Sequence, residues 1–165
     1  MAAVRIETAT VLDWSDLAGT VETLAGQVRA DEMPDVVVGV LRGGMIPAVL
    51  LAHRLGVRMV RAVEIVHTVS DGVDAAKTTQ PQVSNPVSLG VLAGLDVLVV
   101  DDIAGSGDTI AHTVDLVRAA HAGRVRTAVC IVNAANWRRP QRPEQALTYI
   151  GATVEGWMIF PWENR

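Results

Sequence analysis

Continuous hydrophobic runs along the chain predict the strands of one buried sheet. Three runs are rich in β-branched residues and lack polar alternation, which is typical of strands covered on both faces. They are residues 35–41, 96–100 and 125–132. A fourth run, residues 60–66, carries more polar positions and is expected nearer an edge of the sheet.

Helical spacing of hydrophobic residues fills the segments between these strands. Residues 15–30 place their apolar side chains on one stripe, and Ser15 is the expected N-cap. A second helix is expected over residues 44–56, where Gly56 ends it, and a third over about 108–120. The apolar stripe of the third helix is formed by Ile110, Ala111, Val114 and Val117.

The alternation of strands and helices predicts an α/β fold, an open parallel sheet flanked by helices. Such folds bind ligands beyond the carboxyl ends of their strands. Two segments do not follow the alternation. Residues 67–94 form a long connection with little apolar periodicity, which is typical of a lid or another functional loop. The tail, residues 156–165, gathers two of the four tryptophans and the only phenylalanine.

The composition is typical of a globular protein that forms a single domain. Half of the residues are hydrophobic and 19% are charged, and no repeat or change in composition divides the chain, so residues 1–165 are expected to form one domain. No apolar run approaches the roughly 20 residues that span a membrane, and the start does not resemble a secretory signal. The lone Cys130 has no partner for an intramolecular disulfide. We therefore expect a cytoplasmic protein without a membrane partner, and the net charge of −4 argues against nucleic-acid binding.

The stretch VLVVDDIAGSGDTI, residues 97–110, carries the strongest chemical signal. A strand leads into a glycine-containing turn and then into a helix N-terminus, so several backbone amides face one point together with the positive end of the helix dipole. Ser106 and Thr109 add hydroxyl groups, and the whole predicts a phosphate-binding loop. It is not a dinucleotide fingerprint, because Ile110 stands at the third glycine position, nor a P-loop, because no lysine follows.

Two adjacent carboxylates, Asp101 and Asp102, stand where the strand enters this loop. Such a pair can bind a metal ion, accept a phosphoryl group or accept hydrogen bonds from the vicinal hydroxyls of a sugar. Each hydrogen bond to a charged acceptor contributes roughly 1.5 to 3 kcal/mol. Beside a phosphate-binding loop, the pair favours a ligand that carries a sugar diol and a phosphate, which is a ribose 5-phosphate unit.

These residues resemble the phosphoribosyl pyrophosphate motif of the type I phosphoribosyltransferases. The stretch VVVGVLRGGMIPAVLLAHRLGV, residues 36–57, is similar to the first strand, pyrophosphate loop and following helix of that family. The stretch GWMIFPWE resembles the carboxyl-terminal purine-binding segment of its xanthine-guanine and hypoxanthine subgroup. The resemblance implies a small hood over residues 133–165. It also implies that residues 67–94 are the mobile catalytic loop, whose Lys77 could contact pyrophosphate.

By this resemblance, the chain would transfer the 5-phosphoribosyl group from phosphoribosyl pyrophosphate to a ring nitrogen of a nucleobase. The subgroup implies a 6-oxopurine acceptor, in purine salvage or a specialised nucleotide pathway, and a homodimer or homotetramer. Pyrophosphate would bind Leu41, Arg42, Gly43 and Gly44, with an unusual cis peptide before Arg42. Ribose 5-phosphate would bind Asp101, Asp102, Ala104, Gly105, Ser106, Gly107, Asp108 and Thr109. The catalytic groups would be Arg42, Asp101 and Asp102, with Mg²⁺ held by the donor's pyrophosphate and ribose hydroxyls and by the two aspartates.

The expected acceptor site departs from the subgroup at two positions. Base contacts would come from Asn133, Trp157, Met158 and Phe160, with Trp157 stacking on the base, backbone groups near Met158 and Phe160 reading its edge, and Trp162 only packing. The subgroup commonly has an acid at the position of Gly105, which manages the proton of the base, and a lysine at the position of Asn133, which reads an exocyclic oxygen. Arg138 or Arg139 could supply the second contact from the following loop.

Two other functions are weighed against transfer. The chain could be a regulatory module that binds the donor or a nucleotide but has lost efficient catalysis, which Gly105 favours. A phosphoacceptor receiver domain fits poorly, because such domains place their acid pair after the first strand, whereas Asp101 and Asp102 follow the third.

Overall fold

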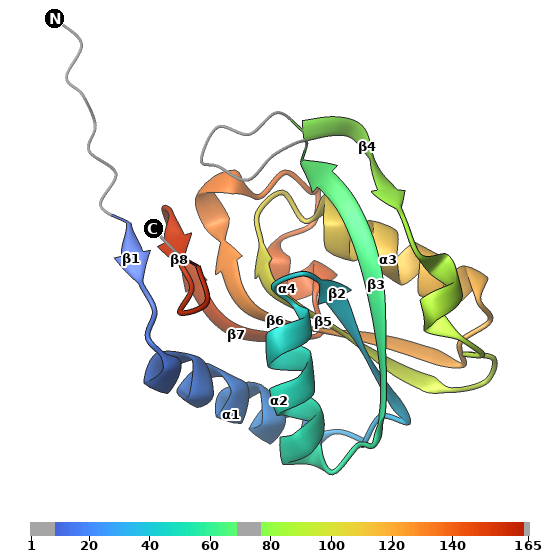
Figure 1. Ribbon diagram of the computed structural model, residues 1–165. Coiled ribbons are helices and arrows are strands. Elements are labelled where there is room, and N and C mark those ends of the chain that lie inside the picture. The colour runs from blue at the N-terminus through green and yellow to red at the C-terminus, as the bar shows by residue number, and fades with distance from the viewer. Residues whose placement is uncertain (1–8, 69–76, 164–165) are drawn as a thin grey trace, which may run out of the picture.

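The computed structural model describes residues 9–68 and 77–163 and shows a six-stranded sheet with helices on both faces (Figure 1). The strands follow the order β4-β3-β2-β5-β6-β7 across the sheet. The sheet is parallel across its five strands β3, β2, β5, β6 and β7. At one edge, β4 pairs with β3 in the antiparallel sense. The expected open parallel sheet is thus confirmed. The strands are β2 (Val36–Leu41), β3 (Met59–Thr68), β4 (Lys77–Val83), β5 (Asp96–Ala104), β6 (Arg124–Asn133) and β7 (Tyr149–Val154).

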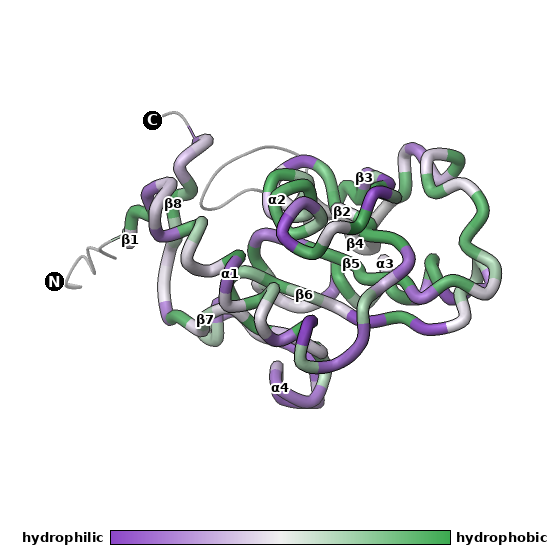
Figure 2. The backbone as a smooth tube through the Cα atoms, turned by 90° about the horizontal axis from the view of Figure 1, so that it is seen from below, coloured by the Kyte–Doolittle hydropathy of each residue, from purple (hydrophilic) through white to green (hydrophobic). Residues whose placement is uncertain are grey.

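Helices α1 (Trp14–Ala30) and α2 (Met45–Leu55) cover one face of the sheet, and α3 (Asp108–Ala119) covers the other (Figure 1). Successive residues of β5 face opposite cores: Leu98 packs with α1 and α2, and Val99 packs with α3. Both faces of the central strands are therefore buried, which explains their unbroken hydrophobic runs. Figure 2 shows this hydrophobic interior and a hydrophilic segment around α4 (Pro143–Ala146).

A second, two-stranded sheet lies beside the main sheet, where β1 (Thr10–Val11) pairs in parallel with β8 (Met158–Ile159) (Figure 1). The C-terminal segment therefore completes its small sheet with residues from the other end of the chain. Part of the range expected to form the hood, residues 133–165, instead returns to the main sheet as β7. The sequence pattern missed β7, because as an edge strand it buries only Tyr149 among its six residues.

Two element boundaries differ from the prediction. Helix α1 begins one residue early and is capped by Asp13, which accepts a hydrogen bond from the backbone N–H of Asp16 at 2.8 Å. The Asp16 carboxylate in turn accepts one from the Asp13 N–H at 3.0 Å, so this reciprocal capping box displaces Ser15 from the N-cap position. Strand β5 runs past Val100 to Ala104, because its ladder with β6 continues along the acidic residues.

The connection over residues 67–94 contains regular structure that the sequence did not predict. Strand β3 extends to Thr68, β4 pairs back onto it, and the short 3₁₀ helix η1 (Pro86–Leu89) follows. Strands β3 and β4 are joined by main-chain hydrogen bonds. Such pairing does not require a periodic pattern of apolar residues, so the sequence pattern did not indicate β4. Residues 69–76 lie outside the described part of the chain, and Lys77 begins β4.

Charged side chains tie together the end of the sheet where β5, β6 and β7 begin. The buried Arg126 guanidinium contacts both carboxylate oxygens of Asp96, at 3.1 and 2.8 Å, and donates to the Tyr149 hydroxyl at 2.8 Å. That hydroxyl donates to Asp31 at 2.7 Å, at the end of α1. The hydrogen bond and the nearby arginines hold the pKa of Asp31 below its ordinary value.

The interior also contains the single cysteine, and burial raises the pKa of the Cys130 thiol, as suits an inert core residue. Over residues 9–68 and 77–163, no helix has the length and apolar character that crossing a membrane requires.

Candidate active site

Three neighbouring strands bring the predicted functional segments to one edge of the sheet. Strands β2, β5 and β6 are adjacent and parallel, so the loops that follow them leave from the same side. Residues 42–44 follow β2, residues 105–107 follow β5, and η2 (Ala134–Asn136) follows β6. The motifs read separately from the sequence therefore meet in space at the carboxyl ends of the strands, where open α/β sheets bind ligands.

The acid pair lies at the end of β5 rather than in the loop. Asp101 is buried, and its Oδ1 accepts a hydrogen bond from the Asp102 N–H at 3.0 Å. The Oδ1 of Asp102 accepts one from the Ile103 N–H at 2.8 Å. Burial, followed by the neighbouring charge of Asp102, raises the pKa of Asp101 well above its ordinary value. Burial also raises the pKa of Asp102, and the charge of Glu163 adds to that rise.

The loop after β2 packs its bare backbone against this pair. A Cβ atom on Gly43 would lie 1.9 Å from Oδ2 of Asp102, and one on Gly44 would lie 2.7 Å from Oδ1 of Asp101. At Gly44 a side chain is excluded, because its Cβ would also lie 2.6 Å from the main-chain carbonyl oxygen of Val40, whereas at Gly43 a side chain would displace the Asp102 carboxylate. The predicted cis peptide, Leu41–Arg42, is present, and the Arg42 side chain is exposed at the same edge. The pyrophosphate and ribose motifs are thus one packed unit.

The segment after β5 has the geometry of an anion-binding turn. Gly107 is the N-cap of α3 and adopts a left-handed conformation, with φ of 85°. The Ser106 hydroxyl accepts a hydrogen bond from the Asp108 N–H at 3.2 Å, and the first turn of the helix places further N–H groups without helical partners at this point. Ala104, also predicted to contact the phosphate, is buried as the last residue of β5. Any contact of Ala104 with a phosphate would therefore come from its main chain and not from its buried side chain.

Gly105 has room for a side chain. Its φ lies outside the left-handed region, and a Cβ atom there would meet nothing closer than Asn136 Cβ at 3.9 Å. Glycine at this position is therefore not required by the fold, and the missing acid does not follow from a steric conflict.

The Asn133 side chain is used by the protein itself. Its Nδ2 donates to the Gly156 carbonyl at 2.8 Å, and its Oδ1 accepts from the N–H groups of Ala135 and Gly156 at 3.2 and 3.4 Å. The amide therefore ties the end of β6 to the residue that precedes Trp157. These bonds use Oδ1 and one of the two Nδ2 hydrogens, so Asn133 holds the C-terminal segment, and its predicted contact with a base stays a prediction.

Strand β8 directs the main-chain groups of Met158 away from its partner strand. The N–H groups of Thr10 and Leu12 donate to the carbonyls of Trp157 and Ile159, each at 2.9 Å. Alternate residues of a paired strand direct their main-chain groups to the same side, so the N–H and C=O of Met158 point away from β1. Main-chain groups oriented in this way can read the edge of a planar ligand, as the resemblance implies.

The aromatic residues of the tail divide into two groups. Phe160 is buried and stacks on Trp162 with 4.7 Å between ring centroids, and its main-chain N–H donates to the Glu163 carboxylate at 2.8 Å. The Phe160 side chain thus belongs to the core and Trp162 packs as expected, while the predicted main-chain contact with a base near Phe160 stays a prediction. Trp157 is partly exposed, yet its buried Nε1 has no hydrogen-bond partner in the described chain. A buried indole N–H is normally paired, so this donor suits a ligand.

Sequence reasoning missed the segment that covers the phosphate loop. A Cβ atom on Gly107 would lie 2.8 Å from both the Trp137 ring and Arg139 Cγ, and the Arg138 N–H donates to the Ser106 carbonyl at 3.2 Å. The only hint in the sequence was an aromatic residue inside a polar, basic loop.

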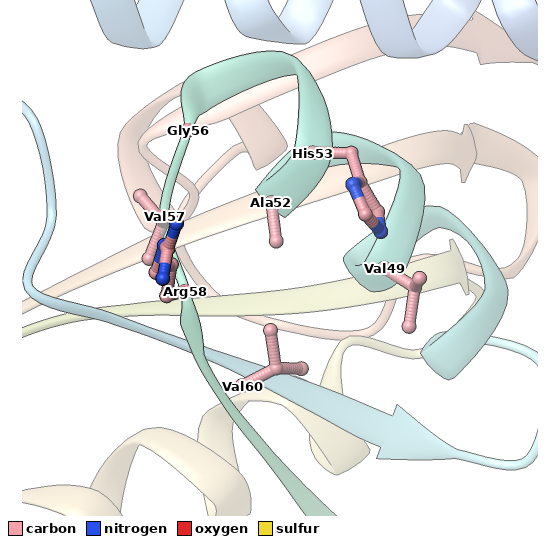
Figure 3. A pocket seen from close by; sticks show the side chains of 7 residues that line it. All are labelled: Val49, Ala52, His53, Gly56, Val57, Arg58 and Val60. Atoms are coloured by element: carbon pink, nitrogen blue, oxygen red, sulfur yellow. The ribbon is translucent and has the colours of Figure 1, made fainter.

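A separate pocket lies between the end of α2 and the start of β3, at the opposite end of the sheet (Figure 3). Its volume is about 420 Å³, and it is lined mainly by apolar side chains such as Val49 and Val60.

The fold is that of an α/β protein in which an acid pair at the end of β5 is followed by a turn with anion-binding geometry. The chain matches the phosphoribosyl transferase domain over residues 7–163 and belongs to that family. It is 30% identical over 129 residues to the xanthine-guanine phosphoribosyltransferase of Roseobacter denitrificans, covering 77% of this chain and 67% of that protein. It is 26% identical over 153 residues to the same-named protein of Gluconobacter oxydans, covering 92% and 82%. The crystal structure of a purine phosphoribosyltransferase from Pyrococcus horikoshii superposes with a TM-score of 0.77 at 27% identity, covering 95% of each chain.

Replacing Gly44 with alanine should destabilise the site and the fold. The new methyl group would lie 2.6 Å from the Val40 carbonyl oxygen and 2.9 Å from the Asp101 Cα, both main-chain atoms, and overpacking of this kind costs about 1 to 3 kcal/mol. Chemical denaturation measures the free energy of unfolding. The control is Gly19→Ala in α1, where nothing lies within 4 Å of the new Cβ and a gain of about 0.5 to 1 kcal/mol is expected. Equal effects of the two substitutions would contradict the packing described here.

Replacing Asp101 with asparagine should stabilise the protein at neutral pH. A pKa raised above the unfolded value makes the folded protein bind the proton more tightly, so the wild type loses stability as pH rises through that window. Asparagine removes this loss, and we expect a melting temperature higher by about 2 to 4 °C, the shift that about 1 kcal/mol produces in a domain of this size.

The gain should vanish below about pH 4, where the aspartate is protonated in both the folded and the unfolded state. Asp115→Asn, on the exposed face of α3, serves as the control and should leave the melting temperature unchanged. A lower melting temperature for Asp101→Asn at pH 7 would show that the carboxylate stabilises the fold.

Proposed function

We propose that the protein transfers the 5-phosphoribosyl group of phosphoribosyl pyrophosphate to a ring nitrogen of a purine base and releases pyrophosphate. The observation that carries this proposal is the direct packing of residues 42–44 against Asp101 and Asp102, next to the anion-binding turn at Gly107. One donor molecule has three parts, a pyrophosphate, a ribose diol and a 5-phosphate. The three segments supply one binding element for each part.

The chemistry of the donor explains each element. As pyrophosphate leaves, the anomeric carbon gains oxocarbenium character and negative charge grows on the leaving group. The Arg42 guanidinium and the backbone amides of Gly43 and Gly44 offset that charge. Asp101 and Asp102 accept hydrogen bonds from the ribose hydroxyls, and the amides of residues 105–109 hold the 5-phosphate away from the two carboxylates. This division keeps the phosphate and the acid pair from repelling each other.

The acid pair also fits a magnesium ion. Mg²⁺ is usually held by one or two carboxylates together with substrate phosphates, and two buried carboxylates with raised pKa values gain from a nearby cation. Within residues 9–68 and 77–163, no cluster of three or more metal-ligating side chains exists, so the donor would have to complete the coordination. When bound, the ion would neutralise charge on the leaving pyrophosphate.

The acceptor half supports a planar base held mainly by main-chain groups. Trp157 offers a stacking surface, Met158 offers one N–H and one C=O, and the Asn133 amide fixes the turn before them. Both curated relatives described above are named xanthine-guanine phosphoribosyltransferases, and the structural neighbour is a purine phosphoribosyltransferase. A 6-oxopurine is the acceptor that these names and this geometry favour. The relatives offer no support for a regulatory module without catalysis.

Two further expectations belong to the same proposal. The homodimer or homotetramer implied by the resemblance stays a prediction that sedimentation can check. Residence in the cytoplasm stays a prediction as well, in keeping with the soluble substrates proposed here.

The reaction is tested by incubating the protein with phosphoribosyl pyrophosphate, Mg²⁺ and a panel of purine and pyrimidine bases. Mass spectrometry should detect a nucleoside monophosphate with a 6-oxopurine. The double variant Asp101→Asn with Asp102→Asn should lose donor binding while remaining folded, because neutral amides bind ribose hydroxyls and Mg²⁺ more weakly. Measurable donor binding without product from any base would overturn the proposed activity, and unchanged donor affinity in the double variant would overturn the ribose assignment.

Gly105 permits a test of proton transfer. The backbone conformation and the 3.9 Å clearance allow aspartate there, and a positioned general base accelerates such steps by roughly 100-fold or more. We expect Gly105→Asp to raise kcat for a 6-oxopurine by about tenfold or more, together with a higher KM for the donor because the added charge stands in the turn proposed to bind its 5-phosphate. Gly105→Asn is the isosteric control without a basic group. Equal rates for the two variants would show that proton removal does not limit turnover.

A further inference from the structure

The segment that follows β6 lies directly on the turn proposed to bind the 5-phosphate. Its Trp137 ring and Arg139 stem leave no space for a Cβ atom at Gly107, and its main chain is hydrogen-bonded to Ser106 through the Arg138 N–H. Trp137 is fixed in turn, because its Nε1 donates to the Gln141 carbonyl at 2.7 Å. The position of Arg139 is therefore set by several contacts and not by its ion pair alone.

The Arg139 guanidinium faces the one carboxylate of the turn. Its Nη1 lies 3.4 Å from Oδ1 of Asp108, the first residue of α3. Both side chains are about 40% exposed, at 39% and 41%, and ion pairs with that exposure contribute little to folding. Stability therefore does not account for an arginine packed at this point.

Electrostatics at the turn gives the arginine a role. A carboxylate at a helix N-terminus is favourable while the turn holds no ligand, because it faces the positive end of the helix dipole. The same carboxylate opposes a phosphate dianion bound to the amides of that turn. Arg139 cancels the negative charge of Asp108 and leaves the amides and the dipole to act on the phosphate.

We propose that Arg139 is a positioning residue that neutralises Asp108 and thereby sets the affinity of the turn for the donor's 5-phosphate. This inference rests on the proposed function, in which the 5-phosphate binds residues 105–109. It differs from the reading suggested by the sequence, in which Arg138 or Arg139 would contact the base. It predicts that the charge of Asp108, and not the arginine side chain as such, is what weakens binding when Arg139 is lost.

The test compares two ligands and matched variants. Ribose 5-phosphate reports on the turn, and pyrophosphate reports on residues 42–44. Calorimetry should show that Arg139→Gln weakens ribose 5-phosphate by roughly tenfold, because the charge of Asp108 is left uncancelled beside the phosphate, and changes pyrophosphate affinity by less than about twofold. Arg138→Gln is the control, since its side chain is exposed and its N–H is retained. It should change neither affinity.

Adding Asp108→Asn to Arg139→Gln decides between charge and structure. If Arg139 acts by neutralising Asp108, the double variant regains most of the lost affinity for ribose 5-phosphate, and Arg139→Lys retains part of it. Unchanged binding by Arg139→Gln, equal weakening of both ligands, or no recovery in the double variant would each overturn the inference. Failure of the wild-type protein to bind ribose 5-phosphate would instead overturn the proposed function, and this inference with it.

Discussion

The site depends on a contact between the main chain of two glycines after β2 and two carboxylates at the end of β5. Gly43 and Gly44 pass so close to Asp101 and Asp102 that a side chain at either position would meet a carboxylate oxygen within 3 Å. The contact sets the segment proposed to bind pyrophosphate directly against the pair proposed to bind ribose. It also buries two carboxylates next to each other, which is unfavourable until a ligand or cation arrives. Stability and function are therefore opposed at the same atoms.

Around this contact, different strands serve the two substrates. Strands β2 and β5 carry the donor elements, and β6 supplies the segment that packs on the phosphate turn. The acceptor elements lie on β8, which is outside the main sheet and is attached to it through the Asn133 amide at the end of β6. Strand β6 is therefore the shared support of the two halves, with Asn133 facing one of them and Trp137 and Arg139 facing the other.

The donor half could be predicted from the sequence because its residues are contiguous. Asp101 to Thr109 and Leu41 to Gly44 each form an unbroken motif on a strongly hydrophobic strand, and the fold follows from the same runs. The acceptor half depends on contacts between distant residues, such as Asn133 with Gly156 and Thr10 with Trp157, which no local pattern records. The contact of the Phe160 N–H with the Glu163 carboxylate was not predicted for the same reason, since it forms only in the folded turn. Strands β4 and β7 were missed because edge pairing needs few apolar residues.

The pairing of β1 with β8 has a consequence for the order in which the protein is made. Synthesis proceeds from the N-terminus, so the main sheet and its donor elements are complete before Met158 and Ile159 emerge. Thr10 and Val11 must wait through that whole interval for their partner strand. The two-stranded sheet therefore joins residues that are synthesised far apart in time, and it can form only after the strands of the main sheet have been made.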